Sequence, residues 1–325
     1  MHFRKLVSVL GVTAACIMAA APVSSAMAQD GWPAKPIRMV VPFATGGSND
    51  VIGRRIAQEL SQRLGQPVVV ENRGGGGGTI GAQVVASAPA DGYTLLFMSS
   101  SLATSAAVQK TPYDPVTAFD PVSRVAAAPF LLVTRTDFPA RTFSEFVDYA
   151  KANPEKLNYG SAGLGDNSQL ATELLNDLAG IRTMAVNYKG TGPALLDLVA
   201  GRIDFTITSI ASIRGTVADQ LPKLVFTGAQ RDPDFSEIPT IRESGLDYVV
   251  ELWWGVFAPA GTPKEVRERL NQEIAAIVRE QEFATFLKSA GATPAPSSSD
   301  ELRADVARDV ERWSKIAVKA GLKVN

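Results

Sequence analysis

The strongest constraint on the fold of this chain is a design that occurs twice: a short β-branched run, a glycine-rich loop and then a helix. Residues 37–41 form the first predicted strand, and a loop with two consecutive glycines separates it from apolar residues at helical spacing. Residues 157–159 form another predicted strand, followed by the loop 160–167 and a helix that Gly180 ends. Strands that alternate with helices in this way indicate α/β sheets with helices on both faces.

The two copies of this design predict two lobes. We assign residues 29–128 and 252–325 to the first lobe and residues 129–251 to the second. The joins, near residues 122–133 and 248–259, are apolar and unlike flexible Gly/Ser linkers, so they favour a hinge of two crossings. The C-terminal helices are expected to return to the first lobe. Because ligands of open α/β sheets bind beyond the carboxyl ends of the strands, a ligand cleft is expected between the lobes.

The first 28 residues have the pattern of a secretory signal peptide. Arg4 and Lys5 precede an apolar run over residues 6–21, and small residues follow up to Ala28. We therefore expect cleavage after Ala28 and export to the periplasm. The apolar run is shorter than the roughly 20 residues that a membrane-spanning helix needs. Lipidation at Cys16 is the alternative to this cleavage.

Cleavage would leave a chain without histidine or cysteine, because His2 and Cys16 are the only ones present. Such a chain cannot form a Ser-His-Asp or Cys-His nucleophile, a His/Cys zinc site or a disulfide. Arg4 and Lys5 leave as well, so 30 basic residues face 33 acidic ones and the net charge becomes −3. This balance, without a Lys/Arg cluster, excludes nucleic acid as a partner. We expect no catalytic residue, no metal and no cofactor; the alternative is a secreted α/β enzyme that uses neither histidine nor cysteine.

The two glycine-rich loops are the candidates for binding a ligand. Gly46 and Gly47 let the backbone approach a ligand closely, and the helix behind them turns free N–H groups toward the loop. Such a loop can hold a carboxylate without a charged side chain, and a Cβ at Gly47 is expected to block it. The loop 160–167 repeats this arrangement, with Ser161 and Asn167 as polar groups. For each loop alone, an ordinary βα turn is the alternative interpretation.

Three further features have competing explanations. Residues 187–193 form another glycine-containing loop, which a turn before a helix explains equally well. Residues 76–81 match the G-x-G-x-x-G fingerprint of dinucleotide sites, but no acidic residue stands about twenty positions on, which favours close packing of helix on strand. Trp253 and Trp254 either line a pocket or lie in the core.

The chain also contains a series of ordered sequence blocks. They are Trp32-Pro33, Pro36-Ile37-Arg38, Val41-Pro42-Phe43, Gly46-Gly47, Asp50, Val70-Glu71-Asn72-Arg73, Gly78-Thr79-Ile80-Gly81, Ala90-Asp91-Gly92-Tyr93-Thr94-Leu95, Pro112-Tyr113-Asp114-Pro115, Tyr159-Gly160-Ser161, Tyr188-Lys189-Gly190 and Ala258-Pro259-Ala260-Gly261-Thr262-Pro263. Together these blocks resemble the Bug-type solute-binding proteins of tripartite tricarboxylate transporters, which have the type II periplasmic binding-protein fold. The resemblance covers essentially the whole chain after the signal peptide.

The resemblance implies a monomeric periplasmic protein that captures a small mono- or dicarboxylate between its lobes for the permease subunits of such a transporter and catalyses nothing. It also implies that backbone groups and bridging waters of the two loops hold the anion. The binding residues that we predict are Phe43, Ala44, Thr45, Gly46, Gly47, Ser48, Asn49, Ser99, Thr104, Ser161, Ala162, Gly165, Asn167, Gln169 and Thr208.

Three positions depart from the pattern of the family. Arg73-Gly74-Gly75 stands where the family usually has Arg-Pro-Gly, Gln169 where a histidine is common, and Thr208 where an aspartate commonly ends the strand. An aspartate at the last position would favour a ligand that carries an ammonium group. Since Thr208 offers only a neutral hydroxyl, we expect a carboxylate without an ammonium group.

Overall fold

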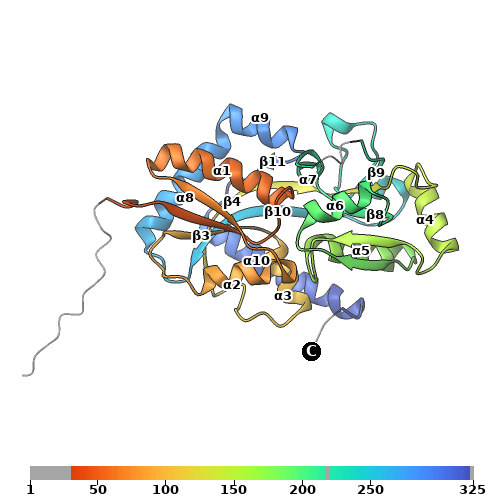
Figure 1. The fold of residues 1–325 in the computed structure, drawn as a ribbon, viewed down its shortest axis with the longest axis horizontal. Helices are drawn as coiled ribbons and strands as arrows, with labels where there is room; N and C mark the ends of the chain where they lie inside the picture. Colours follow the sequence, from red (N-terminus) through yellow and green to blue (C-terminus); the bar gives the residue numbers. More distant parts are fainter. Residues whose placement is uncertain (1–30, 217–219, 323–325) are drawn as a thin grey trace, which may run out of the picture.

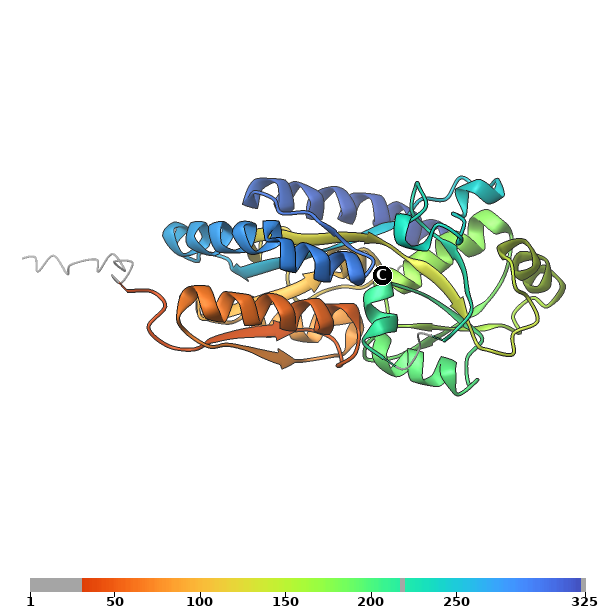
Figure 2. The same cartoon turned by 90° about the horizontal axis from the view of Figure 1, so that it is seen from above.

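The computed structural model describes residues 31–216 and 220–322, which form two β-sheets flanked by helices (Figure 1). The predicted signal peptide and Cys16 lie outside the described residues. Within the described ranges, no helix is both long and apolar enough to cross a membrane. Seen from above, the two sheets and their helices form two lobes side by side (Figure 2). The predicted α/β architecture with two lobes is confirmed.

The first lobe is built on a sheet with strand order β11-β4-β10-β3-β1-β2. β1 pairs in parallel with β2 and β3, whereas β10 runs antiparallel between β3 and β4. The strands are β1 (Ile37–Val41), β2 (Val68–Asn72), β3 (Thr94–Ser99), β4 (Phe119–Pro129), β10 (Glu251–Pro259) and β11 (Thr293–Pro294). The helices are α1 (Ser48–Leu64), η1 (Gly76–Gly78), α2 (Thr79–Ala86), α3 (Ser101–Val108), α8 (Lys264–Arg279), α9 (Gln281–Ser289) and α10 (Ser299–Lys319).

Helices cover both faces of this first sheet, as the alternation predicted. Successive side chains of β1 point to opposite faces. Met39 belongs to the apolar cluster that contains Ile52 and Ile56 of α1. Val40 belongs to a separate cluster with Val85 of α2. Because both faces of the central strands are buried, their sequences are continuous apolar runs rather than alternating ones.

The second lobe is built on a sheet with strand order β7-β6-β8-β5-β9, in which β6 is parallel to β7 and β8. The strand that the sequence predicts over residues 157–159 extends further than expected, since Gly160 and Ser161 belong to the strand and not to the loop. The strands are β5 (Leu131–Thr134), β6 (Asn158–Ser161), β7 (Met184–Asn187), β8 (Phe205–Thr208) and β9 (Lys223–Phe226). The helices are α4 (Phe143–Ala152), α5 (Asn167–Ala179), α6 (Thr191–Val199), α7 (Ile210–Arg214), η2 (Pro233–Phe235) and η3 (Arg242–Ser244).

The chain crosses between the sheets twice. It leaves the first sheet at the end of β4, where Phe130 precedes β5, and it returns after β9 by entering β10. Phe130, Leu252 and Trp254 are buried in an apolar cluster that contains residues of both lobes. The hinge is therefore packed rather than exposed. The division at residues 128/129 and 251/252 stays our proposed boundary.

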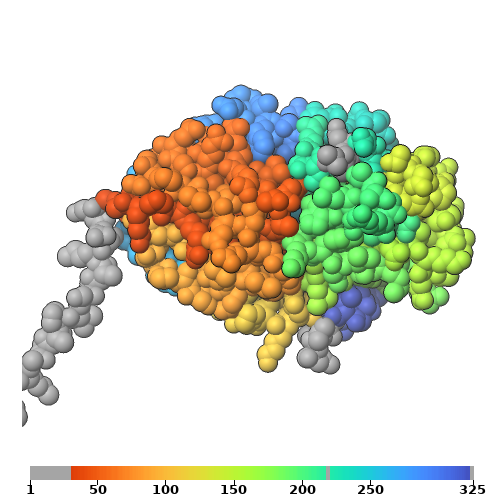
Figure 3. Space-filling model, viewed as in Figure 1, coloured from red at the N-terminus to blue at the C-terminus, as the bar shows by residue number. Residues whose placement is uncertain are grey.

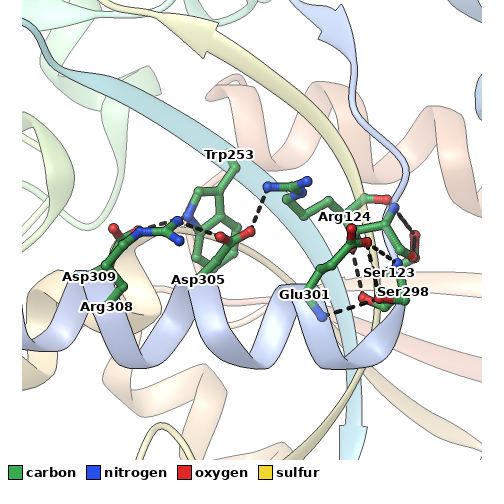
Figure 4. Close-up of polar contacts among 9 residues, drawn as sticks. Ser123, Arg124, Trp253, Ser298, Glu301, Asp305, Arg308 and Asp309 are labelled. Atoms are coloured by element: carbon green, nitrogen blue, oxygen red, sulfur yellow. Dashed lines mark hydrogen bonds and ion pairs between the residues drawn. The ribbon is translucent and has the colours of Figure 1, made fainter.

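The helix α10 starts on the first lobe and ends against the second. Trp253 of β10 donates its indole N–H to Asp309 of α10 at 2.8 Å, and Arg124 of β4 pairs with Asp305 one turn earlier (Figure 4). At its other end, Lys319 pairs with Asp177 of α5 at 2.6 Å. The C-terminal helices thus return to the first lobe as expected, but the last turns of α10 also reach the second.

Local sequence signals account for several helix ends. Thr142 and Glu145 form a capping box at the start of α4, a pattern that residue type alone can indicate. Gly65 and Gly180 end α1 and α5 in the left-handed conformation that glycine adopts without steric cost. At the start of α1, Gly47 occupies the cap position and supplies no side-chain cap. Asp50 Oδ2 instead accepts from Gly46 N at 3.2 Å.

Candidate ligand-binding site

One helix from each lobe begins at the interface between the lobes. α1 starts directly after the loop that follows β1, and α5 starts directly after the loop that follows β6. The first N–H groups of a helix have no partner within the helix, so they can bind an anion. The two helix starts differ, however. Gly47 gives α1 no side-chain cap, whereas the Asp166 side chain caps α5 by accepting from Gln169 N.

A small polar cavity lies between these helix starts, where the two lobes are in contact (Figure 3). Its volume is about 20 Å³, which is room for about one water molecule. The lobes must therefore separate before a dicarboxylate can enter. The lining residues are Ser48, Asn49, Ser99 and Ser101 from the first lobe, Phe130 and Leu252 from the hinge, and Ala162, Asp166, Asn167, Ser168, Thr191, Ile207, Thr208, Ser209 and Ser212 from the second lobe.

Two side chains of this cavity have a polar atom without a hydrogen-bond partner in the described part of the chain. They are Thr208 Oγ1, at the end of β8, and Asn49 Oδ1, in the first turn of α1. Thr208 is 2% exposed and Asn49 is 9% exposed. Buried polar atoms in native proteins nearly always have a partner, either in the protein or in a bound molecule. Both atoms are therefore available to form a hydrogen bond with a ligand.

Asn167 connects the second lobe to a row of hydroxyls in the first. Its Oδ1 accepts from Ser100 Oγ and Thr104 Oγ1 at 3.2 Å each, and its Nδ2 donates to Ser99 Oγ at 3.3 Å. Asn49 Nδ2 donates to the same Ser99 hydroxyl at 3.4 Å. Residues that line the cavity therefore also hold the lobes together, so ligand binding and lobe closure involve the same hydrogen bonds.

Backbone groups of the two lobes also meet directly. Ser48 N donates to Ser212 Oγ at 2.9 Å, and Ala44 N donates to Lys189 O at 2.9 Å. A Cβ added at Gly47 would lie 3.6 Å from the Thr191 Cβ, which is ordinary van der Waals contact. A single Cβ at Gly47 therefore fits between the closed lobes, and the expectation that it blocks the approach of a ligand stays a prediction.

The glycine run at residues 74–78 also meets the second lobe. A Cβ at Gly77 would lie 2.2 Å from Leu164 O, closer than any side chain could be accommodated. Ser105 Oγ donates to Gly77 O at 2.7 Å and fixes this part of the run. Gly78 and Gly81 have the tight packing within the first lobe that the sequence suggested, because a Cβ there would lie 2.5 Å from Met98 Cε and 2.6 Å from Pro42 Cβ, respectively. The run thus gives the lobes a close backbone approach.

The cavity brings together only part of the predicted set. Ser48, Asn49, Ser99, Ala162, Asn167 and Thr208 line it. Gln169 Oε1 accepts from Gly165 N at 2.6 Å, so this side chain supports the loop from behind. Ser161 Oγ likewise donates to Asn187 Oδ1 at 2.5 Å. Direct ligand contact stays a prediction for the whole set, and the members that are not among the lining residues are Phe43, Ala44, Thr45, Gly46, Gly47, Thr104, Ser161, Gly165 and Gln169.

The sequence analysis missed several polar lining residues. They are Ser101, Asp166, Ser168, Thr191, Ser209 and Ser212. Ser209 follows β8 and caps α7, so a serine directly after a predicted strand was an available signal. Asp166 stood inside a loop already singled out, and its residue type is a preferred helix cap. Asp166 therefore adds an acidic side chain to a site for which only neutral side chains were predicted.

Asp166 is the one charged side chain among the described lining residues. It is 5% exposed, and its Oδ1 accepts from Ala162 N and Gln169 N at 3.2 Å and from Ser168 Oγ at 2.5 Å. Burial raises the pKa of the Asp166 carboxyl above its usual value, and these hydrogen bonds oppose the rise. The cavity therefore holds a desolvated acid without a cationic side chain beside it in the lining.

The two adjacent tryptophans belong to the core and not to the cavity. Trp253 packs in the apolar cluster with Phe257 and directs its indole N–H to Asp309. Trp254 is fully buried in the cluster that includes Phe130. Elsewhere in residues 31–216 and 220–322, no group of three His, Cys, Asp or Glu side chains is placed to hold a metal ion.

Comparisons with known proteins agree with this arrangement. A family model described as "Tripartite tricarboxylate transporter family receptor" matches residues 52–322. Protein BugT of Bordetella pertussis is 34% identical over the full length of both chains. The fold is similar to that of the periplasmic binding protein BugD, with 34% identity and a TM-score of 0.86 over 90% of this chain and 99% of that one.

Two further similar structures contain a named carboxylate. An R. palustris protein solved with adipate is 38% identical, with a TM-score of 0.85 over 89% of this chain and 98% of that one. MatC from Rhodopseudomonas palustris, solved with bound malate, is 34% identical, with a TM-score of 0.82 over 88% of this chain and 99% of that one.

Proposed function

The chain belongs to the tripartite tricarboxylate transporter receptor family, and from this premise we propose that it captures a small organic mono- or dicarboxylate for a membrane permease. The family consists of periplasmic solute-binding receptors and not of enzymes. Cleavage of the signal peptide after Ala28 and action as a monomer are parts of the same proposal. The adipate and malate of the two R. palustris structures support a carboxylate ligand.

The observation that supports this function most is the chemistry of the cavity. Its lining combines hydroxyl and amide side chains with the uncapped start of α1, and it includes no Lys or Arg among the described residues. A helix start attracts anions through free N–H groups and the positive end of the helix dipole. The unpaired Thr208 Oγ1 can donate a hydrogen bond to the same carboxylate, whereas Asn49 Oδ1 is an amide oxygen and can only accept one. A carboxylate can thus be held without a cationic side chain.

The contacts between the lobes supply the second part of the function. A ligand that touches both α1 and β8 gains all of its contacts only when the lobes are closed, so binding favours closure. The Asn167 side chain, which bonds Ser99, Ser100 and Thr104 across the interface, stabilises that closed form. We expect the radius of gyration in small-angle scattering to fall when ligand is added.

A thermal-shift screen of small carboxylates tests the proposal. A ligand present at about 100 times its Kd adds roughly 2.7 kcal/mol to the free energy of unfolding, so a true ligand raises Tm clearly. Mass spectrometry of ligand that co-purifies with the protein gives an independent identification. If no carboxylate in a broad panel raises Tm and none co-purifies, the proposed function is wrong.

A matched pair of variants then tests the cavity itself. Thr208→Val removes the unpaired hydroxyl in the cavity, and Thr134→Val removes an equally unpaired, fully buried hydroxyl of β5 that does not line it. Neither change leaves a protein donor without its acceptor, so both variants should fold normally. Only Thr208→Val should weaken binding of the ligand found in the screen. Equal affinities of the two variants would remove Thr208 from the site.

The proposed role in transport is tested by measuring uptake in cells. Uptake of the same labelled carboxylate should fall when the gene for this chain is deleted and should return when the gene is restored. Unchanged uptake, with binding intact in vitro, would confine the function to capture.

A further inference from the structure

We propose that Asp166 determines ligand specificity by making the cavity prefer carboxylates that bear an ammonium group over the same carboxylates without one. The inference rests on the proposed function, because it names the ligand class of the same cavity. It replaces the expectation drawn from Thr208, which assumed that no acidic side chain reaches the site.

The two helix starts differ in charge, and this difference indicates which end of such a ligand lies at each helix. At α5, the Asp166 carboxylate already occupies the cap position and accepts from Gln169 N. At α1, the cap residue is Gly47, which has no side chain to offer. At α1, Ser48 N donates to Ser212 Oγ and Asp50 N donates to Gly47 O, which leaves Asn49 N in the first turn for a ligand carboxylate. At α5 the same carboxylate would meet the negative charge of Asp166. The carboxylate end belongs at α1 and a positive end belongs beside Asp166.

The charge of the cavity also favours a ligand with an ammonium group. Asp166 is buried and lines the cavity without a Lys or Arg among the other described lining residues. An isolated buried carboxylate is unfavourable, and a cation that pairs with it offsets the lost hydration. A ligand ammonium supplies that cation. A plain dicarboxylate instead places a like charge in the same small space, which disfavours binding.

The unpaired atoms fit an ammonium group better than a second carboxylate. Asn49 Oδ1 can only accept a hydrogen bond, and Thr208 Oγ1 can accept one. A carboxylate has about four acceptor sites, of which the three hydrogen bonds to Asp166 Oδ1 leave some unused. An ammonium carries three donors, and a carboxylate carries none. The cavity lining thus contains unused acceptor capacity at Asn49, Asp166 and Thr208.

Titration calorimetry on the whole exported chain tests the inference with matched ligands. The probes are succinate against aspartate and glutarate against glutamate, which differ within each pair only by the ammonium group. We expect the wild type to bind the amino acid at least about tenfold more tightly in any pair that binds. Asp166→Asn should lose most of this preference, because it removes the charge and keeps the shape.

Two further variants separate charge from structure. Asp166→Ser retains a side-chain oxygen that can cap α5, so it keeps the helix start without the charge. Asp177→Asn removes a carboxylate from the other end of the same helix, where Asp177 pairs with Lys319. The first should behave as Asp166→Asn does, and the second should keep the wild-type preference. Circular dichroism and Tm establish that each variant is folded.

The outcomes distinguish this inference from the function on which it rests. If carboxylates bind but the wild type shows no preference for the amino acids, the inference fails and the function stands. The same holds if folded Asp166→Asn and Asp166→Ser keep the full preference. A loss of plain dicarboxylate binding in those variants would also contradict the inference, because removal of a like charge should strengthen that binding. If no carboxylate binds at all, the proposed function fails and the inference fails with it.

Discussion

A single methyl group at Gly192 should separate lobe closure from folding. Gly192 lies in the first turn of α6 and its φ is not in the left-handed region, so alanine suits its local backbone. A Cβ at this position would lie 2.2 Å from Thr45 O and 3.3 Å from Thr45 C. Both atoms belong to the first lobe. The clash therefore exists only when the lobes touch, and it is absent when they are apart.

The size of the effect follows from that distance. The separation is about 1.2 Å short of ordinary van der Waals contact, and both partners are main-chain or Cβ atoms that cannot rotate away. Forced overpacking typically costs about 1–3 kcal/mol. Here it raises the free energy of the closed form alone. If binding requires closure, ligand affinity should fall by roughly 5- to 150-fold. The free energy of unfolding should stay the same or rise by up to about 1 kcal/mol, since alanine favours a helix over glycine.

Calorimetry with the carboxylate identified by screening measures the affinity, and small-angle scattering at saturation measures closure. Leu196→Ala is the control, because Leu196 lies on the same helix, is 54% exposed and does not line the cavity. We expect Gly192→Ala to bind weakly and to remain extended, while Leu196→Ala behaves as the wild type. Wild-type affinity and a wild-type radius of gyration for folded Gly192→Ala would refute the view that ligand binding uses this closed interface.

Two predictions concern stability. Burial raises the pKa of the Asp309 carboxyl, so its contribution to stability is present at low pH and is lost as the pH rises through the folded-state pKa. Asp309→Asn, whose amide oxygen can still accept from the Trp253 indole N–H, should raise Tm relative to the wild type more at pH 7 than at pH 4; a constant difference would contradict this. Thr142→Ala, which removes the capping box with Glu145, should lower the free energy of unfolding by about 1 kcal/mol in denaturant titrations, whereas Ser144→Ala in the same turn should leave it nearly unchanged.

Much of the fold was determined by local sequence signals. The capping box at Thr142, the glycine that ends α5 at Gly180 and the apolar strand runs all depend on neighbours within one element. The interactions involved are made inside a few consecutive residues, so the pattern of residue types is enough to predict them. The repeated strand, loop and helix predicted the two lobes, the sequence blocks indicated the family, and the comparisons confirmed that family.

The site was determined only where the tertiary structure joins distant residues. Ser48 meets Ser212 across 164 positions of the chain, and no local pattern connects the two. Whether Asp166 faces solvent or a buried cavity, and whether Gly77 packs on its own helix or on Leu164 of the other lobe, depends on how the two lobes dock. Residue type showed which groups can cap a helix or allow a close backbone approach. The docking of the lobes decided which of them share one cavity, because burial and charge pairing are set by contacts between elements far apart in the sequence.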